Sequence, residues 1–275
     1  MTSKSILITG CSTGIGLHAA KALHERGYRV FATARQQKDV AALTEAGLES
    51  LPLDLDNAES IEACFKLILE KTGGTLDYLF NNGAYGQAGA VEDLSTDVLR
   101  QQFETNVFGW HHLTRLAIKV MRQQGHGRIV QNSSVLGVVC MPYRGAYNAS
   151  KYAIEGLTDT LRLELSDSPI HISLLEPGPI TSNFRKTAAL KFRQNIDWEN
   201  SYHTENYQLQ LERLEKKGAT TAFTLGPEAV TKCLLHALES KRPKLRYRIT
   251  FPTKLFAVLK RLLSARAMDR ILTKG

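Results

Sequence analysis

The chain has 275 residues, of which 43% are hydrophobic and 23% are charged. These globular proportions provide enough apolar surface for one continuous core and argue against a disordered protein. Between Lys241 and Gly275, eleven Lys or Arg residues accompany one acid, Asp269, so this tail carries +10 of a formal net charge of +8 and the rest of the chain carries −2. The basic charge belongs to the tail, which argues against a nucleic-acid-binding protein.

The cysteines Cys11, Cys64, Cys140 and Cys233 are scattered, with no CxxC pair and no metal-ligand spacing, and the histidines form no such spacing either. We therefore expect no metal. A strand-like run starts at Ser5, which leaves no room for a signal peptide, and no apolar run reaches the length of about 18 residues that spans a bilayer. These features predict a cytoplasmic protein that is at most peripheral to the inner membrane face.

Short apolar runs alternate with amphipathic segments along most of the chain. The expected strands are Ser5–Thr9, Tyr28–Thr33, Ser50–Leu55, Leu76–Asn82, Gly127–Ser134 and His171–Pro177. Helices are expected up to Arg26 and over Val107–Gln124 and Tyr147–Ser168. This cadence is typical of an α/β fold with a single doubly wound parallel sheet, of Rossmann type, with helices on both faces.

The character of the chain changes after Pro177. Residues 183–222 are polar and helix-prone and predict a helical lid inserted over the site, and KLRYRIT at Lys244–Thr250 resumes the strand pattern. Residues 251–274 predict a basic amphipathic C-terminal helix. We expect residues 1–275 to form one domain whose cofactor-binding and catalytic core is residues 5–182.

The first expected strand leads directly into TGCSTGIG, which carries Gly10, Gly14 and Gly16. Glycines at this position permit a tight turn and a close approach of backbone to a pyrophosphate, which then lies at the positive end of the next helix. An ordinary strand-to-helix turn is the alternative. The location between a strand and a helix favours a dinucleotide site.

Arg35 ends the second expected strand, where an NAD-binding protein would place an acid for the adenosine ribose. The first acid after it is Asp39. A guanidinium can pair with a 2′-phosphate, so the residue favours NADP(H), with an exposed strand-end arginine as the alternative.

Tyr147 and Lys151 lie four residues apart on an expected helix and therefore on one face. A free tyrosine has a pKa of about 10, and a neighbouring ammonium favours its ionised form. Ser134 precedes Tyr147 by thirteen positions, at the carboxyl end of a strand, where its hydroxyl could hold a substrate carbonyl. Ser133 should point the opposite way.

These motifs together resemble the short-chain dehydrogenase/reductase family. TGxxxGIG, DLD, FNNGAYG, TNVFG, NSSV, YNASK and EPGPI occur in the family's order between Ser5 and Ile180. The resemblance implies four catalytic residues, namely Asn106, Ser134, Tyr147 and Lys151. It implies cofactor contacts at Gly10, Ser12, Thr13, Gly14, Ile15, Gly16, Arg35, Asp54, Leu55, Asn82, Gly83, Tyr147, Lys151, Pro177, Gly178, Ile180 and Thr181.

Two details of the resemblance carry further expectations. The family writes NNAG where this chain has Asn81, Asn82, Gly83 and Ala84, and we expect Asn82 to keep its role. In the family, the residue at the position of Asn106 holds a water that links the lysine to solvent; a capping or core asparagine is the alternative.

Apolar and aromatic residues are expected around the substrate. Those assigned to it are Ser134, Leu136, Met141, Tyr143 and Tyr147, with Val138, Val139, Tyr85 and Val91 nearby. They imply a small lipophilic carbonyl compound or alcohol. The match through FTLGPEAV at Phe223–Val230 and the basic tail is similar to the hydroxysteroid and retinol dehydrogenase branch, closest to bacterial NADP-dependent aldehyde reductases. We also expect a homo-oligomer, either a dimer or a tetramer.

Two other functions of the protein stay open, and so do two positions for its C-terminal helix. An NADP-binding redox sensor without turnover could lose the tyrosine and the lysine, and an epimerase or dehydratase acting on nucleotide sugars would usually carry a larger C-terminal domain. In the tail, Leu255, Val258, Leu259, Leu262, Leu263 and Ile271 recur at helical spacing among basic residues. Such a helix docks on the fold or lies on an anionic membrane.

Overall fold

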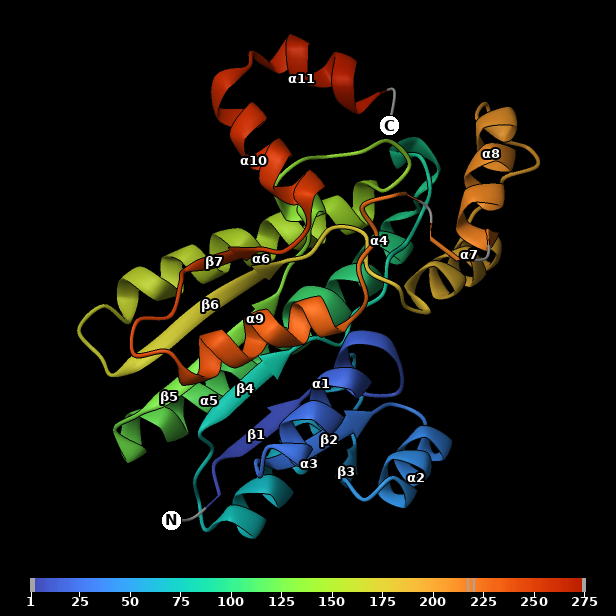
Figure 1. Ribbon diagram of the computed structural model, residues 1–275. Coiled ribbons are helices and arrows are strands. Elements are labelled where there is room, and N and C mark those ends of the chain that lie inside the picture. The colour runs from blue at the N-terminus through green and yellow to red at the C-terminus, as the bar shows by residue number, and fades with distance from the viewer. Residues whose placement is uncertain (1–2, 217, 220, 274–275) are drawn as a thin grey trace.

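The structure, a computed structural model, describes residues 3–216, 218–219 and 221–273. Seven parallel strands form one sheet in the order β3-β2-β1-β4-β5-β6-β7 (Figure 1). Their bounds are β1 Ser5–Ile8, β2 Arg29–Ala34, β3 Glu49–Pro52, β4 Tyr78–Asn81, β5 Gly127–Asn132, β6 Ile170–Glu176 and β7 Arg246–Arg248. The expected doubly wound parallel sheet is confirmed, and every expected strand is present within a few residues of its predicted bounds.

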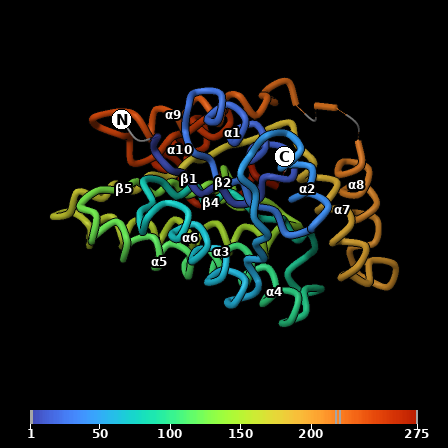
Figure 2. Tube along the Cα trace, turned by 90° about the horizontal axis from the view of Figure 1, so that it is seen from below, coloured from blue at the N-terminus to red at the C-terminus, as the bar shows by residue number. Residues whose placement is uncertain are grey.

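Helices cover both faces of the sheet (Figures 1 and 2). Their bounds are α1 Gly14–Glu25, α2 Gln37–Glu45, α3 Ala58–Thr72, α4 Thr96–Phe103, α5 Gly109–Gln124, α6 Gly145–Glu164, α7 Phe184–Asn195, α8 Thr204–Glu215, α9 Glu228–Glu239, α10 Phe251–Leu262 and α11 Ala265–Leu272. Short turns of helix are η1 Val91–Asp93, the π-helical η2 Glu104–Phe108 and η3 Val135–Gly137.

Two apolar clusters hold the helices against the sheet. In β1, Ile6 and Ile8 pack with α1 and α9, whereas Leu7 packs with α3, α5 and α6 on the other face. Successive residues of a strand alternate faces, so a strand covered on both sides must be apolar throughout. The order of the strands along the sheet reverses between β1 and β4. This architecture places its ligand crevice there, at the carboxyl ends of the strands.

The lid expected at residues 183–222 is present as α7 and α8, which pack together at one end of the molecule (Figure 1). Phe192 and Tyr207 join the two helices, with ring centroids 4.9 Å apart. The Tyr207 hydroxyl accepts a hydrogen bond from the backbone N–H of Ala90 at 2.8 Å and donates one to Asp93 at 2.5 Å. The lid is thereby fixed to the segment that follows β4.

The C-terminal tail differs from the single helix expected over residues 251–274. Leu263 is extended, with φ −99° and ψ 148°, so the chain forms α10 and α11 with a break between them. The Ser264 side chain accepts a hydrogen bond from the backbone N–H of Ala267. Ser264 thereby caps α11, whose first N–H groups have no partner within the helix. Met268 of α11 is buried against the residues after β5, and Lys274 lies outside the described residues. No helix within the described ranges is both long and apolar enough to cross a bilayer.

Candidate active site

A cavity of about 800 Å³ lies at the carboxyl ends of the strands and is bordered by the lid and by α10. The predicted residues that line it are Gly10, Ser12, Thr13, Gly14, Ile15, Arg35, Asp54, Leu55, Asn82, Gly83, Ser134, Leu136, Met141, Tyr147, Lys151, Pro177, Gly178, Ile180 and Thr181. Gly16, Asn106 and Tyr143 are absent from the lining. The cavity therefore joins most of the predicted cofactor and substrate residues in one continuous space.

The glycine loop between β1 and α1 forms one end of this cavity. Gly10 and Gly14 have positive φ values of 68° and 60°, which side chains rarely adopt. A Cβ on Gly10 would lie 2.5 Å from the Cα of Gly83, so the loop has no space for one. The Thr13 side chain makes no capping bond to α1, and the first N–H groups of the helix face an open site.

Gly16 has a packing role and does not line the cavity, and the cofactor contact expected there stays a prediction. A Cβ on Gly16 would lie 2.2 Å from the carbonyl oxygen of Gly10 and 2.7 Å from Nδ2 of Asn82. The glycine therefore allows α1 to approach the loop closely. This is the role of the last glycine in a dinucleotide fingerprint.

Asn82 braces the glycine loop. Its Nδ2 donates to the carbonyl oxygen of Thr9 at 3.0 Å, and its Oδ1 accepts from Asn132 at 2.9 Å. The backbone N–H groups of Asn82 and Gly83 both donate to Oγ1 of Thr9 at 2.8 Å. Because Gly and Ala are exchanged relative to the family pattern, Gly83 is the residue that contacts the glycine loop after β4. Asn82 supports that loop through its hydrogen bonds.

The adenosine end of the cavity lies beyond β2 and β3. Arg35 is exposed there and, within the described residues, has no hydrogen bond or salt bridge to another side chain. Asp54 follows β3, and its Oδ1 accepts the backbone N–H of Asp56 at 3.1 Å. The guanidinium of Arg35 is therefore available to an anionic ligand.

Tyr147 and Lys151 lie at the opposite end, on α6. Lys151 is only 1% exposed. Its Nζ donates to the carbonyl oxygen of Asn132 at 2.7 Å and lies 4.5 Å from the ring centroid of Trp110 and 5.5 Å from that of Tyr147. The carbonyl and the two rings hold the amine at one position.

Burial controls the ionisation of this pair. Burial raises the pKa of Tyr147 to about 12, although the Ser134 hydroxyl opposes the rise. Burial lowers the pKa of Lys151 to about 7, and the negative charge of Glu155 opposes that fall. Tyr147 is therefore protonated near neutral pH and carries a proton that it can donate.

Ser133 and Ser134 lie directly after β5 and both border the cavity, but their hydroxyl groups have different neighbours. Ser134 lines the cavity, and its Oγ accepts the backbone N–H of Leu136 at 3.1 Å. Ser133 instead lies with Glu155: a Cβ on Gly137 would be 2.6 Å from Oγ of Ser133 and 3.1 Å from Oε1 of Glu155. The Ser133 hydroxyl is thus directed toward Gly137 and Glu155, and the Ser134 hydroxyl is the one that we expect to bind a substrate.

Asn106 lies in the π-helical turn η2 and is fully buried. Its Nδ2 donates to the Tyr85 carbonyl at 3.0 Å and to Oγ of Ser150 at 3.1 Å, and its Oδ1 accepts the Tyr85 N–H at 3.2 Å. The Ser150 hydroxyl donates to the carbonyl of Tyr147 at 2.8 Å. The side chain therefore ties the segment after β4 to the catalytic helix, which is the structural alternative for this residue, and a catalytic role for Asn106 stays a prediction.

A network of charges lies behind the catalytic helix. Arg246 of β7 contacts Glu155 at 3.0 Å, Asp159 at 2.6 Å and Glu176 at 3.0 Å, and Arg248 contacts Glu176 at 3.3 Å. Burial raises the pKa of Glu155 to about 7, opposed by Ser133 and Arg246. The last strand is thus joined electrostatically to the helix that carries Tyr147 and Lys151.

The substrate end differs in part from expectation. Leu136, Met141 and Tyr85 line the cavity, but Tyr143 does not. The φ of Tyr143 is +59°, and its ring packs 5.7 Å from that of Tyr207 in the lid, so this backbone conformation aims the ring away from the site. Val91 is 74% exposed, and Val138 and Val139 pack in the cluster that contains Met268.

Several aromatic residues of the site were not among the predictions. The ring of Phe184 in α7 lies 5.2 Å from that of Tyr147, and Trp110 packs against Lys151. Phe251 of α10 stacks on Phe223 at 5.1 Å, and both line the cavity. Phe184 and Phe251 carry no local motif, because only the packing of α7 and α10 brings them to the site.

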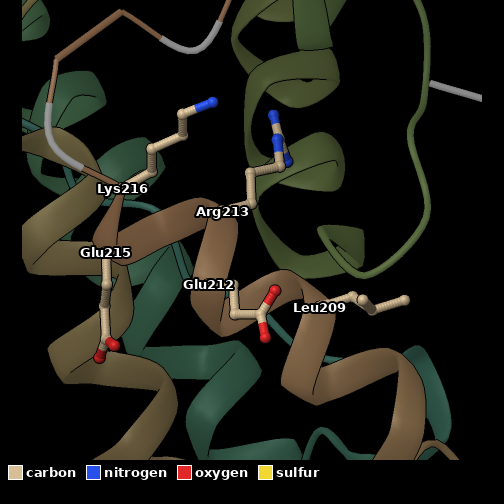
Figure 3. Close-up of a pocket in the computed structure, with 5 residues that line it drawn as sticks. All are labelled: Leu209, Glu212, Arg213, Glu215 and Lys216. Atoms are coloured by element: carbon tan, nitrogen blue, oxygen red, sulfur yellow. The ribbon is translucent and has the colours of Figure 1, made fainter.

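A second pocket lies outside this cavity, at the end of α8 (Figure 3). It is lined by Leu209, Glu212, Arg213, Glu215 and Lys216, which belong to one helix and the residue after it. Arg213 and Lys216 extend to one side, and Glu215 points the other way (Figure 3). Arg213 also lines the main cavity and therefore stands at the boundary between the two.

Residues 4–191 match the family described as short chain dehydrogenase. The chain belongs to the short-chain dehydrogenase/reductase family. It is 42% identical over 270 residues to the uncharacterized oxidoreductase YbbO of Escherichia coli strain K12, covering 98% of this chain and 94% of YbbO. It is 32% identical over 274 residues to human 17-beta-hydroxysteroid dehydrogenase type 1, covering 95% of this chain and 81% of the human protein.

Among solved structures, a variant of actinorhodin polyketide ketoreductase with NADPH is similar to this chain. It shares 28% identity at a TM-score of 0.70 and covers 86% of this chain and 91% of its own. The family and the glycine cradle together indicate an oxidoreductase that uses a nicotinamide dinucleotide. The residues fit that cofactor, because the glycine loop and the start of α1 line a cavity that continues to Tyr147, and a helix N-terminus can bind a pyrophosphate.

Proposed function

We propose that this protein is an NADP(H)-dependent oxidoreductase that interconverts a lipophilic carbonyl compound, of aldehyde, retinoid or sterol type, and its alcohol. The position of Tyr147 carries the proposal. Its phenol borders a cavity that starts at the glycine loop, and it lies beside the buried Lys151 and the Ser134 hydroxyl. The bound nicotinamide would supply or accept the hydride.

The chain's own groups would move the proton and orient the substrate. Ser134 would donate a hydrogen bond to the substrate carbonyl, and Tyr147, whose pKa burial raises to about 12, would give its proton to the same oxygen during reduction. Lys151, held by the Asn132 carbonyl, would keep the phenol oriented and, when protonated, would favour the phenolate that alcohol oxidation requires. Asn106 is catalytic by its resemblance to the family's asparagine, and its hydrogen bonds through Ser150 would also position the catalytic helix.

Arg35 supports NADP(H) over NAD(H). Its guanidinium borders the adenosine end of the cavity and has no acidic partner among the described residues, so it is suited to a 2′-phosphate. The ketoreductase similar to this chain is a complex with NADPH. Four free cysteines, Cys11, Cys64, Cys140 and Cys233, support a reducing and therefore cytoplasmic location.

Stopped-flow measurement of NADPH oxidation with a panel of aldehydes, retinoids and ketosteroids tests this function. We expect a burst of oxidation with at least one class and much slower oxidation with NADH. A redox sensor would bind NADPH without oxidising it with any carbonyl compound. An epimerase would act on nucleotide sugars with no net loss of NADPH.

We further propose that the outer face of α10 contacts an anionic membrane peripherally. On this face Val258 is 51% exposed and Leu262 is 74% exposed, next to the exposed Lys254 and Arg261. Lys260 instead donates to the Val138 carbonyl at 2.6 Å, so the inner face is docked on the fold. Apolar residues flanked by basic ones are suited to the interface of an anionic bilayer.

Cosedimentation with anionic vesicles at low salt tests the membrane contact. A truncation after Thr250 would also remove Phe251 and Phe256 from the cavity lining, so surface variants are the cleaner test. We expect Leu262→Asp and Arg261→Glu to reduce vesicle binding and Lys119→Glu, on an exposed position of α5, to leave it unchanged. Equal binding by all variants would contradict the contact. The expected dimer or tetramer is tested by light scattering of the same preparations.

A further inference from the structure

Charges are distributed unevenly along the cavity. The only carboxylates among its described lining residues are Asp39 and Asp54, which lie with Arg35 at the nucleotide end beyond β2 and β3. Four cationic side chains, Arg144, Arg185, Lys191 and Arg213, line the remainder of the cavity in addition to Lys151. The part of the cavity that surrounds Tyr147 is therefore positive as well as apolar.

Two of these cations have no acidic partner in the part of the chain that the structure describes. The one polar side-chain contact of Arg144 joins its Nη1 to the sulfur of Met141 at 2.8 Å. Nζ of Lys191 lies 5.4 Å from the ring centroid of Tyr85 and makes no hydrogen bond or salt bridge to any residue that the structure describes. Both residues are half-buried. Partial burial of a charge costs hydration free energy, and no protein group offsets that cost when the charge has no partner. A ligand of opposite charge would offset it.

Both cations belong to the reacting end of the cavity. Arg144 immediately precedes α6 and lies three residues before Tyr147. Lys191 shares one face of α7 with the lining residues Phe184, Thr187 and Ala188, because positions three, four and seven apart lie on the same side of a helix. The Phe184 ring of that face packs 5.2 Å from the ring of Tyr147.

The other two cations have different positions and contacts. The guanidinium of Arg185 donates to the carbonyl oxygens of Arg213, Lys216 and Gly218 and so holds the end of α8. Arg213 stands at the boundary with the outer pocket (Figure 3). Arg144 and Lys191 are therefore the pair placed to meet a substrate.

We propose that the substrate is amphiphilic: an apolar carbonyl compound that also carries an anionic group, such as a carboxylate, bound by Arg144 and Lys191. This inference rests on the proposed reduction at Tyr147 and narrows its substrate class. Leu136, Met141 and Phe184 contact the apolar part, and the two cations bind the anion. A charge-assisted hydrogen bond of this kind is stronger than one between neutral groups.

Steady-state reduction of three probe families of matched chain length tests the inference: linear ω-oxo carboxylates, their methyl esters and simple alkanals. The wild-type protein should show a kcat/KM for the best oxo carboxylate at least about tenfold above that for its ester. Lys191→Gln and Arg144→Gln should each lower this ratio several-fold, because the oxo carboxylate loses a charge-assisted contact that its ester and the alkanals do not make. Lys186→Gln, an exposed position of α7 outside the cavity lining, should preserve the ratio.

Three outcomes would overturn the inference. A wild-type ratio near one, or a ratio that neither variant changes, would exclude anion recognition while leaving the proposed reduction intact. A raised KM for NADPH with an unchanged ratio would assign the two cations to the cofactor. NADPH that stays unoxidised with all three probe families and with the wider carbonyl panel would reject the proposed function itself. Thermal unfolding checks that Arg144→Gln is folded, and Lys191→Gln, on a different helix, provides the second variant.

Discussion

The two ends of the cavity are built in different ways. The glycine loop at the nucleotide end consists of backbone from one stretch of chain, with Gly10 at positive φ and Gly14, also at positive φ, opening α1. The catalytic end consists of side chains from separate helices, among them Tyr147 on α6, Phe184 on α7 and Phe251 on α10. The glycine loop depends on the space beside each glycine, whereas the catalytic end depends on how the helices pack. Mutations at the two ends should therefore affect different properties, namely cofactor binding and turnover.

Tyr147→Phe gives the largest expected effect and the clearest separation of the two ends. It removes the phenolic hydroxyl and leaves the glycine loop unchanged. Reduction should slow roughly 10²- to 10⁴-fold at saturating substrate, because general acid catalysis contributes about that much. NADPH affinity, measured by fluorescence titration, should stay close to the wild-type value. Turnover within a few fold of wild type would mean that another group supplies the proton.

Arg35→Asp tests the nucleotide end alone. The change removes a cation that can bind the 2′-phosphate and adds repulsion, so the ratio of kcat/KM for NADPH to that for NADH should fall roughly a hundredfold. Lys38→Asp, an exposed neighbour on α2 that does not line the cavity, should leave the ratio nearly unchanged. The assignment of Arg35 fails if both variants behave alike.

Gly10→Ala and Gly27→Ala separate close packing from backbone strain. Both glycines have positive φ, 68° and 84°, but a Cβ on Gly27 would have no neighbour within 4 Å. Strain alone should lower the free energy of unfolding by about 1 kcal/mol in Gly27→Ala. Overlap with Gly83 should raise the loss to about 2–3 kcal/mol in Gly10→Ala and weaken cofactor binding. Denaturant unfolding measures both values, and equal losses would mean that the loop can relax.

Lys151→Met tests whether burial lowers the pKa of Lys151, through the pH dependence of the free energy of unfolding. Burial lowers the pKa of Lys151 in the folded protein to about 7, whereas an unfolded lysine keeps its proton up to about 10.4. Between these values the unfolded chain binds more protons, so wild-type stability should gain up to about 1.4 kcal/mol per pH unit from this residue as the pH rises. Denaturant unfolding of both proteins from pH 7 to 9 should show a smaller rise in the variant, and parallel curves would contradict the burial effect.

The glycine turn and the helix that carries Tyr147 and Lys151 could be predicted from the sequence, because their signals are local. The loop TGCSTGIG specifies both the turn and the helix that follows, and Tyr147 and Lys151 are related by helical spacing alone. The alternation of short apolar runs with amphipathic segments likewise predicted the parallel sheet. In each case the relevant residues are close together in the chain or share one simple periodicity.

The residues that sequence reasoning misplaced depend on contacts between distant segments. Tyr143 follows Met141 in an apolar stretch, yet its positive φ and its packing on Tyr207 direct it to the lid. Phe184 and Phe251 carry no motif and reach the cavity only because α7 and α10 fold over it. The break at Leu263 was hidden by a continuous helical spacing of apolar residues, although Ser264 is a residue type that begins helices.

The salt bridges of Arg246 have a consequence for the order in which the protein matures during synthesis. Synthesis proceeds from the N-terminus, so the residues of the glycine loop are available for folding long before those of β7. Until then Glu155, Asp159 and Glu176 lack the cation that joins them, and α10 has not yet closed its side of the cavity. A nascent chain halted near residue 240 should therefore bind NADPH before it can oxidise it, and ribosome-stalled chains of increasing length would measure that interval.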